Sequence, residues 1–160
     1  MTTPTAIRPA RAADAIAARA LARTAYQHYV PRMGREPAPM LADYGELIAA
    51  GEVYLLEGQG RLVGLIVLRS EKDALFVENV AVDRAAQGRG HGRTLMSFAE
   101  AEARRRGASS IELYTNIAMT ENLDFYPRLG FRETGRRVED GYHRVYFEKP
   151  VGPAADTDKA

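Results

Sequence analysis

The residues with the clearest chemistry lie in the run Gly88-Arg-Gly-His-Gly92, where a strand is expected to turn into a helix. Glycine has no side chain, so alternating glycines leave backbone N–H groups uncovered at the start of that helix. Such groups bind phosphate, and the helix dipole adds a modest attraction. The run therefore predicts a cradle for a diphosphate, and a tight turn without a ligand stays open as the alternative.

Two better-known phosphate loops do not fit this run. A P-loop requires Lys followed by Ser or Thr after its last glycine, whereas Arg93 and Thr94 follow Gly92. A dinucleotide-binding fingerprint requires a small residue where Arg93 stands. The run therefore matches neither of these two phosphate-binding loops, and a tight turn without a ligand stays open.

A second candidate for chemistry is the polar pair Glu78-Asn79, which interrupts the apolar run Ala74–Val82. A carboxylate inside a buried strand is costly unless it has a partner or a role. Glu78 is therefore the first candidate for a general base, and Glu112, on the next strand, is the second. A salt-bridged or solvent-facing strand glutamate is the alternative for both.

Composition excludes several other classes of function. The chain has no cysteine, which excludes disulfides, thiolate metal sites and a cysteine nucleophile. Its 22 Lys and Arg against 21 Asp and Glu leave a net charge of +1, so neither nucleic acid nor a membrane surface is an expected partner. The three histidines show no metal-ligand spacing, and no metal is expected. With no signal-like or membrane-spanning run, the expected location is the cytoplasm.

Two motifs identify a family. The run Gln87-Gly-Arg-Gly-His-Gly92 resembles the acetyl-coenzyme A motif of the GNAT superfamily of N-acetyltransferases, and Val80-Ala-Val82 ends the preceding strand as in that family. About forty residues later, Asp124-Phe-Tyr-Pro-Arg-Leu-Gly-Phe131 resembles the family's Tyr-x-x-x-Gly-Phe element. One position departs from the pattern: Met119 stands where many members carry asparagine, and the nearby asparagines are Asn116 and Asn122.

The resemblance implies acetyl-CoA as the co-substrate and assigns its contacts. In the family, two neighbouring strands splay and the pantetheine arm lies in the gap, bonded to backbone groups of the first strand. An exposed arginine, Arg84, Arg89 or Arg93, would meet the 3′-phosphate. The cofactor-binding residues implied in this way are Val80, Ala81, Val82, Gln87, Gly88, Arg89, Gly90, His91, Gly92, Arg93, Asn116, Asn122 and Tyr126.

The chemistry implied is acetyl transfer to a primary amine. Without cysteine, the simplest mechanism is direct attack in a ternary complex. Tyr126 is the candidate acid, since a phenol of pKa about 10 can donate a proton to a thiolate whose conjugate acid has a pKa of about 8.5. Glu78 is the candidate base. A small-molecule amine is the preferred acceptor, and peptide or protein N-acetylation and a non-catalytic acyl-CoA sensor are the alternatives.

The acceptor pocket is expected to take its walls from variable parts of the chain. Aromatic and basic residues gather at the end of the first helix and in the last hairpin, and they are equally explained as core residues. The candidates are Tyr26, Tyr29, Arg32, Met33 and Tyr142, with His28 and His143 beside them.

The elements that position these residues follow from hydrophobic periodicity. We expect a single domain over residues 5–150 and a flexible tail over 151–160, with the monomer or a homodimer as the assembly. The fold class is α/β (α+β): a GNAT-like mixed, largely antiparallel sheet of about seven strands, with helices on both faces. The expected strands are 5–8, 53–57, 62–68, 74–82, 110–115, 131–138 and 142–149, and the expected helices are 12–29, 40–50, 90–106 and 120–129, with the proline-rich stretch 31–39 irregular.

Overall fold

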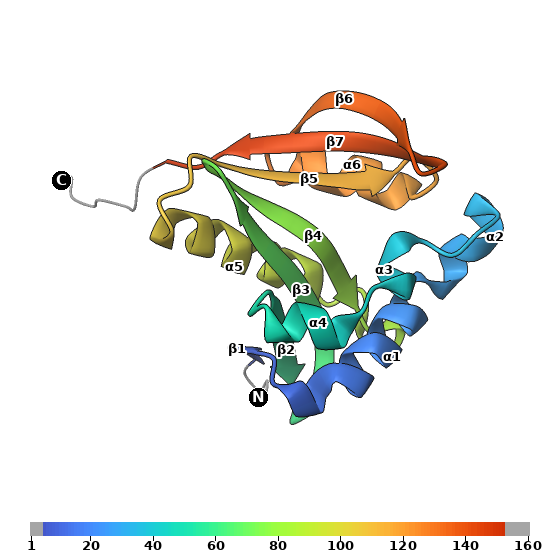
Figure 1. Cartoon of the computed structure of the whole chain (residues 1–160), viewed down its shortest axis with the longest axis vertical. Helices are drawn as coiled ribbons and strands as arrows, with labels where there is room; N and C mark the ends of the chain where they lie inside the picture. The colour runs from blue at the N-terminus through green and yellow to red at the C-terminus, as the bar shows by residue number, and fades with distance from the viewer. Residues whose placement is uncertain (1–4, 153–160) are drawn as a thin grey trace. The chain divides into compact units, whose positions relative to one another are not determined.

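The computed structural model describes residues 5–152 and contains a seven-stranded mixed sheet in the order β1-β2-β3-β4-β5-β7-β6 (Figure 1). The predicted fold class of a mixed, largely antiparallel sheet is confirmed. Contacts divide the chain into two compact units, one of residues 1–68 and 79–95 and the other of 69–78 and 96–160. Strands β3 (Arg61–Glu71) and β4 (Ala74–Val82) and helix α5 (His91–Arg105) each contribute residues to both units.

In the first unit, β1 (Thr5–Pro9) pairs antiparallel with β2 (Val53–Gly58), and β2 pairs antiparallel with β3. The β2–β3 turn has positive φ at Gln59 and Gly60, as a two-residue hairpin requires. Residues 63–68 of β3 are buried on both faces, which confirms the predicted central strand. The close packing of this strand needs a glycine, because a Cβ at Gly64 would lie 3.0 Å from the Ala81 carbonyl oxygen and 3.1 Å from a Leu95 methyl.

The helices of the first unit are shorter than predicted. The expected helix 12–29 is divided into η1 (Ala12–Asp14), α1 (Ala15–Tyr26) and η2 (Gln27–Tyr29). The expected helix 40–50 is divided into α3 (Ala38–Leu41) and α4 (Tyr44–Ala49), because the extended backbone at 42 and 43 lets the Asp43 carboxylate accept from Glu46 N at 3.1 Å. Helices α3 and α4 both contact α1.

The prediction that residues 31–39 cannot be regular structure is wrong in part. Pro31 lies in the first turn of α2 (Val30–Met33), and Pro39 lies in the first turn of α3. Proline is tolerated there because an N–H in the first turn has no partner within the helix. Gly34, with φ +73°, ends α2.

The second unit is built around β5 (Ser110–Asn116). Residues 74–77 of β4 run parallel to 110–113 of β5, and β7 (Tyr142–Pro150) runs antiparallel along all of β5. Strand β6 (Arg132–Glu139) pairs antiparallel with β7, and the hairpin turn has positive φ at Asp140 and Gly141. Helix α6 (Thr120–Arg128) lies close to β6.

The first residue of the predicted tail, Val151, is packed against the rest of the chain. Val151 is buried, and its N–H donates to the Ser109 carbonyl at 2.9 Å, so it continues the packed structure of β7. The remainder of the predicted tail, from residue 153, lies outside the described residues. Across residues 5–152, no helix is both long enough and apolar enough to span a membrane.

Candidate active site

The glycine-rich turn joins β4 to α5 through the short helix η3 (Arg84–Ala86). Gly88 and Gly90 have φ of +84° and +81°, and an added Cβ at either would meet nothing within 4 Å. The left-handed backbone, and not lack of space, therefore requires glycine here. Thr94 closes the first helical turn, since both its N–H and its hydroxyl donate to the Gly90 carbonyl, at 3.0 and 3.1 Å.

The start of α5 meets the conditions for binding an anion. The first N–H groups of a helix have no acceptor within the helix, which here leaves the amides of His91, Gly92 and Arg93 pointing out of its amino end. Arg84, Arg89 and Arg93 are exposed, and none of them has an ion pair with another residue in the described part of the chain. The turn thus combines outward-facing amides with three exposed arginine side chains.

The main chain of β4 next to this turn already carries two side-chain contacts. The Val80 carbonyl accepts from the Tyr26 hydroxyl at 2.6 Å, and the Val82 carbonyl accepts from Gln87 Nε2 at 3.2 Å. Gln87, predicted as a cofactor contact, therefore also ties the turn to the end of the strand.

Asn79, one of the two polar residues that interrupt the apolar run of β4, takes part in a buried hydrogen-bond network. The Tyr44 hydroxyl donates its one proton to the Pro39 carbonyl at 2.6 Å and so accepts from Asn79 Nδ2 at 2.8 Å. Asn79 Oδ1 then faces the Tyr26 hydroxyl at 2.7 Å. The one proton of this hydroxyl is shared between Asn79 Oδ1 and the Val80 carbonyl oxygen. This buried network links α1 and α4 to β4, and it gives Tyr26, predicted as an acceptor wall, a structural contact.

The other acceptor candidates of the first unit form a small cluster at the end of α1. Tyr29 is 8% exposed, and its ring lies 3.9 Å from the His28 ring and 5.1 Å from the Arg32 guanidinium carbon, measured from ring centroids. Met33 is half-buried in α2. Tyr142, the fifth candidate, is buried at the start of β7 in the second unit.

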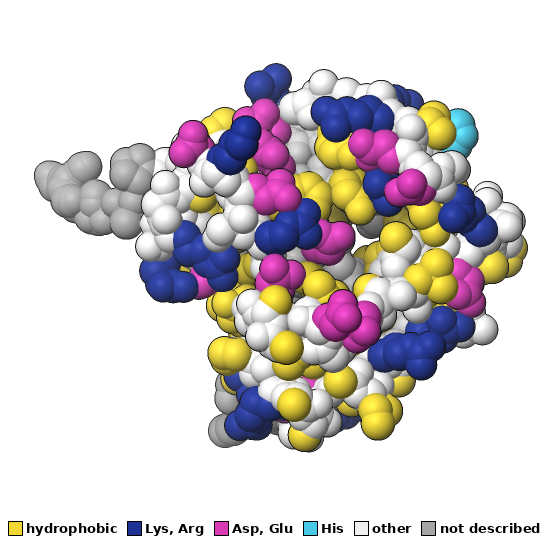
Figure 2. Space-filling view, viewed as in Figure 1, with side chains coloured by type: hydrophobic (Ala, Val, Ile, Leu, Met, Phe, Trp, Pro, Cys, Tyr) yellow, Lys and Arg dark blue, Asp and Glu magenta, His cyan; other side chains and the backbone are white. Residues whose placement is uncertain are grey.

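A cavity of about 860 Å³ lies within the second unit, on one face of its strands. In the space-filling view, acidic and basic side chains are interleaved over the region where Figure 1 draws β4, β5 and β7 (Figure 2). Both carboxylates proposed as the base, Glu78 and Glu112, line the cavity. The full lining is Arg69, Glu71, Phe76, Glu78, Glu112, Tyr114, Thr134, Arg137, Glu139, Asp140, Arg144, Tyr146, Phe147 and Glu148.

Glu78 is held by an ion pair with Arg69 Nη1, which is the salt-bridged alternative left open by the sequence. The same guanidinium contacts Glu71 at 2.8 Å and lies 4.9 Å from the centroid of the Phe76 ring. Burial opposes the charge of Arg69, but its hydrogen bonds to Glu71 and Glu78 outweigh burial and raise its pKa above the ordinary value. The Glu78 side chain is 32% exposed, so it still reaches the cavity.

Three aromatic rings cross the strands beneath the cavity. The Tyr114 ring centroid lies 5.6 Å from that of Phe76 and 5.4 Å from that of Tyr146. Arg144 lies 4.2 Å from the Tyr114 centroid, and Arg137 lies 4.3 Å from the Tyr146 centroid. Burial raises the pKa of the Tyr114 hydroxyl, and burial together with a hydrogen bond to Glu139 raises that of Tyr146, so both phenols stay protonated near neutrality.

Tyr126 lies on the other face of the same strands. It is 7% exposed, and its ring packs against Phe125, Phe131 and Phe147 with centroid distances of 5.1, 5.7 and 5.9 Å. Successive side chains of a strand point to opposite faces, so the Phe147 ring points away from the face of Tyr146 and Glu148. Within the second unit, the candidate acid and the candidate base are therefore not in contact but on opposite faces of the sheet.

The two asparagines near the departure from the family pattern serve local structure. Asn116 Oδ1 accepts from Ala118 N at 2.9 Å, and Asn122 Nδ2 donates to Thr115 Oγ1 at 3.0 Å. Met119 is 5% exposed, and its sulfur lies 3.5 Å from the same threonine hydroxyl. These contacts join the end of β5 to the start of α6.

Groups of three or more side chains that could hold a metal ion are absent from the described residues, 5–152.

The chain is similar in sequence to known N-acetyltransferases. The chain is 29% identical over 98 residues to the uncharacterized N-acetyltransferase YvbK of Bacillus subtilis, covering 61% of this chain and 62% of that protein. It is 37% identical over 112 residues to N-alpha-acetyltransferase 80 of mouse, covering 64% of this chain and 33% of that protein. The chain thus spans less than two thirds of the length of these relatives.

Among solved structures, the PaiA N-acetyltransferase of Thermoplasma acidophilum in complex with coenzyme A superposes with a TM-score of 0.77 at 17% identity, covering 92% of this chain and 99% of that one. At that identity the likeness shows the fold. A model of the acetyltransferase (GNAT) family matches residues 17–131, which include the glycine-rich turn, both candidate carboxylates and Tyr126. The chain belongs to the acetyltransferase (GNAT) family.

Proposed function

We propose that the protein is an acetyl-CoA-dependent N-acetyltransferase that acts on a primary amine of a small molecule by direct transfer. The observation that carries the proposal is the glycine-rich turn, whose left-handed glycines at 88 and 90 expose helix amides next to three unpaired arginines among the described residues. Membership of the family and the coenzyme A bound to the Thermoplasma structure support the same ligand.

The residues around the turn suit the parts of acetyl-CoA. The amides at the start of α5 and residues Gln87–Arg93 would hold the diphosphate, and the exposed arginines offer charge for the 3′-phosphate. The main chain of Val80, Ala81 and Val82 would bond the pantetheine arm, which supplies the thioester. Asn116 Oδ1 and Asn122 Nδ2 make local contacts, and in cofactor binding these two residues would also shape the end of β5.

The transfer needs a proton acceptor for the amine and a proton donor for the leaving sulfur. As the amine nitrogen bonds the acetyl carbon and the carbon–sulfur bond breaks, the amine proton passes to Glu78, directly or through water, and Tyr126 protonates the thiolate. Glu112 is the second candidate base. Both groups must reach the same acetyl carbon, so the mechanism requires the thioester to lie beyond Val77 and Leu113, where the pairing of β4 with β5 ends.

A small acceptor is favoured by the cavity, whose volume of about 860 Å³ lies within the usual range for small-molecule sites. The names of the relatives do not point to one class of acceptor. One relative is N-alpha-acetyltransferase 80 of mouse, and another is the mycothiol acetyltransferase of Jonesia denitrificans. Acetylation of a peptide or protein is therefore the second candidate.

The experiment that tests the proposal has two parts. Calorimetry measures acetyl-CoA binding, and release of free thiol measures turnover with panels of small amines and amino-terminal peptides. The proposal expects binding together with thiol release that depends on a small amine. Tight binding without thiol release from any acceptor would instead indicate an acyl-CoA sensor, and release with peptides alone would indicate a peptide N-acetyltransferase.

A further inference from the structure

The cavity of the second unit carries an excess of negative charge. Six carboxylates and three guanidinium groups line it, which gives a formal charge of −3. The face is also aromatic, with the rings of Phe76, Tyr114 and Tyr146 in a tilted row across its strands. A cavity with this lining favours a ligand that is positively charged and carries apolar segments between its charges.

The arginines of the lining are already committed to carboxylates. Arg69 contacts Glu71 and Glu78, and Arg144 contacts Glu139 at 3.1 Å. Arg137 approaches Glu139 at 3.8 Å. These guanidinium groups are thus partly neutralised and offer little charge to an anionic group of a ligand.

The two lining carboxylates on the paired strands β5 and β7 that take no part in these ion pairs are Glu112 and Glu148. Glu112 on β5 lies directly opposite Glu148 on β7, an arrangement of like charges that destabilises a sheet. Glu112 has no ion pair among residues 5–152, and Glu148 has only Arg132 at 3.8 Å, an arginine that is 72% exposed. A cation placed between Glu112 and Glu148 would relieve this repulsion.

The distance from this pair to the candidate base suits an alkyl chain. Phe76 is the register partner of Glu112, and Glu78 lies two residues further along β4. With strands about 4.8 Å apart and a rise of about 3.3 Å per residue, the Cα atoms of Glu78 and Glu112 lie roughly 8 Å apart. The Phe76 and Tyr114 rings, each in contact with a guanidinium group, give the cavity an aromatic lining between the two carboxylates.

We propose that the acceptor is a diamine or polyamine, with its reacting amine beside Glu78 and a second, protonated amine between Glu112 and Glu148. The inference rests on the proposed acetyltransferase function and names its substrate class. The reacting amine loses its proton to form the amide, whereas the distal ammonium keeps its charge throughout.

The test compares three acceptors of similar length that differ at the far end: putrescine with an ammonium, butylamine with a methyl group and γ-aminobutyrate with a carboxylate. We expect kcat/KM for putrescine to exceed that for butylamine by at least about tenfold, because a charge pair contributes that much at a partly shielded site. Gamma-aminobutyrate is expected to be the poorest of the three. Preference for butylamine or for γ-aminobutyrate would overturn the proposal.

Variants locate the preference on the proposed carboxylates. Glu112→Gln is expected to reduce the ratio of putrescine to butylamine several-fold, and a general loss of activity cancels in that ratio. Glu133→Gln is the matched control, since it removes the same charge from an exposed position on β6 outside the cavity lining. An equal fall in the ratio for both variants would show that net charge, and not the cavity, attracts the diamine.

Ionic strength gives an independent readout. Raising it from about 0.1 M to about 1 M shortens the screening length from about 10 Å to about 3 Å, so the preference for putrescine should weaken. Failure of this proposal is distinguishable from failure of the proposed function: acetyl-CoA binding with turnover of another class of amine overturns the diamine alone, whereas absence of acetyl-CoA binding overturns both.

Discussion

At the scale of single residues, the account depends on Glu78, a carboxylate that an arginine holds at the edge of the cavity. Glu78→Gln should lower kcat at least about tenfold, since general base catalysis contributes about 10²–10⁴-fold, with little change in acetyl-CoA affinity. The loss should be largest at low pH, where the amine is hardest to deprotonate. The pH profile of kcat for the parent and the variant measures this.

The control for that experiment is Glu71→Gln, which removes the other carboxylate bonded to Arg69. Equal loss of rate in the two variants would assign Glu78 to positioning Arg69, and a parental profile in Glu78→Gln would leave Glu112 or water as the base.

Tyr126 is the second residue on which the mechanism depends. Tyr126→Phe keeps the ring contacts with Phe125, Phe131 and Phe147 but removes the proton proposed for the leaving sulfur. We expect kcat to fall at least about tenfold. The free energy of unfolding, measured by thermal denaturation, should change by no more than the roughly 1 kcal/mol that one hydroxyl contributes.

An acyl donor with a more acidic thiol should restore part of the rate of Tyr126→Phe, because its leaving group needs the proton less. A variant that matches the parent under conditions where chemistry limits the rate would remove Tyr126 from the mechanism.

The sequence identified the residues of the turn because their backbone requirement is local: a left-handed φ at Gly88 and Gly90 can be met cheaply only by glycine. It could not show what Glu78 and Asn79 contact, since Arg69 and the two tyrosines that bond Asn79 are brought there by the fold. The break in apolar pattern therefore marked two polar residues correctly but could not distinguish a structural network from a catalytic group.

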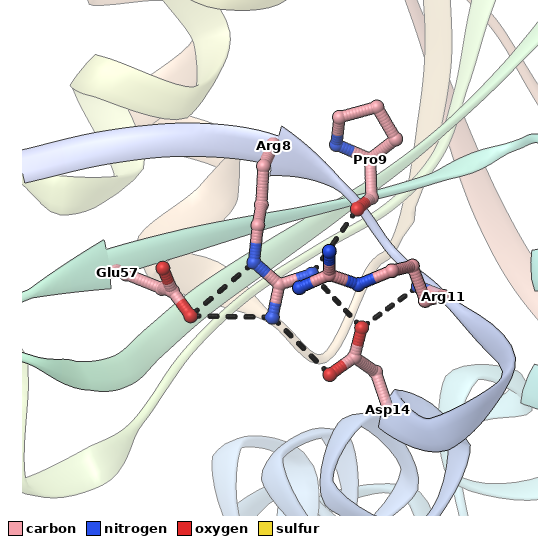
Figure 3. A network of polar contacts seen from close by, with 5 residues as sticks. All are labelled: Arg8, Pro9, Arg11, Asp14 and Glu57. Carbon is pink, nitrogen blue, oxygen red and sulfur yellow. Dashed lines mark hydrogen bonds and ion pairs between the residues drawn. The ribbon is translucent and has the colours of Figure 1, made fainter.

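At the scale of elements, ion pairs and hydrogen bonds stabilise the junction between β1 and η1 (Figure 3). Arg8 contacts Asp14 at 2.9 Å and Glu57 at 3.2 Å, and the Arg11 N–H donates to Asp14 at 2.7 Å. The hydrogen bond from Arg8, aided by that from the Arg11 backbone, lowers the pKa of Asp14 from 3.8 to about 2.

A depressed carboxyl pKa gives a defined pH dependence. The folded state binds this proton less readily than the unfolded state, so the contribution to stability is present above pH 3.8 and is lost as the pH falls toward about 2. Asp14→Asn should lower the free energy of unfolding at neutral pH by about 0.5–1 kcal/mol, a modest value because the pair is partly exposed.

Chemical denaturation of the parent and of Asp14→Asn between pH 2 and pH 7 measures the free energy of unfolding at each pH. We expect the values for the two proteins to converge at the acid end of this range. Asp124→Asn is the control, since Asp124 pairs with Arg128 on the surface of α6, where both side chains are mostly exposed. A difference for Asp14→Asn that persists unchanged at the acid end would contradict the assigned cause.

The predicted boundaries of helices and strands are correct where the hydrophobic periodicity and the turn residues indicate the same boundary. Strand β4 matches its predicted bounds, and the β2–β3 and β6–β7 turns have positive φ at Gly60 and Gly141, where glycine allows it. The prolines at 31 and 39 were misread because proline stops a helix interior yet fits its first turn. The strand order could not be predicted, because periodicity reports which face is buried and not which strand lies beside it.

At the scale of the whole molecule, the glycine-rich turn lies in one compact unit, and the charged cavity with both candidate carboxylates lies in the other. The single domain over residues 5–150 and the assembly as monomer or homodimer stay predictions. The chain has no cysteine, so no thiol in it can carry the acetyl group as a covalent intermediate.

The most direct measurement is a transfer experiment with isotope-labelled acetyl-CoA, in which mass spectrometry follows the label in the intact protein and in the amine. The account predicts that the label stays on coenzyme A until an amine is added and then appears on the amine nitrogen, with none on the protein at any time. Label on the protein before the amine is added, or label that never leaves coenzyme A with any amine, would contradict direct N-acetyl transfer.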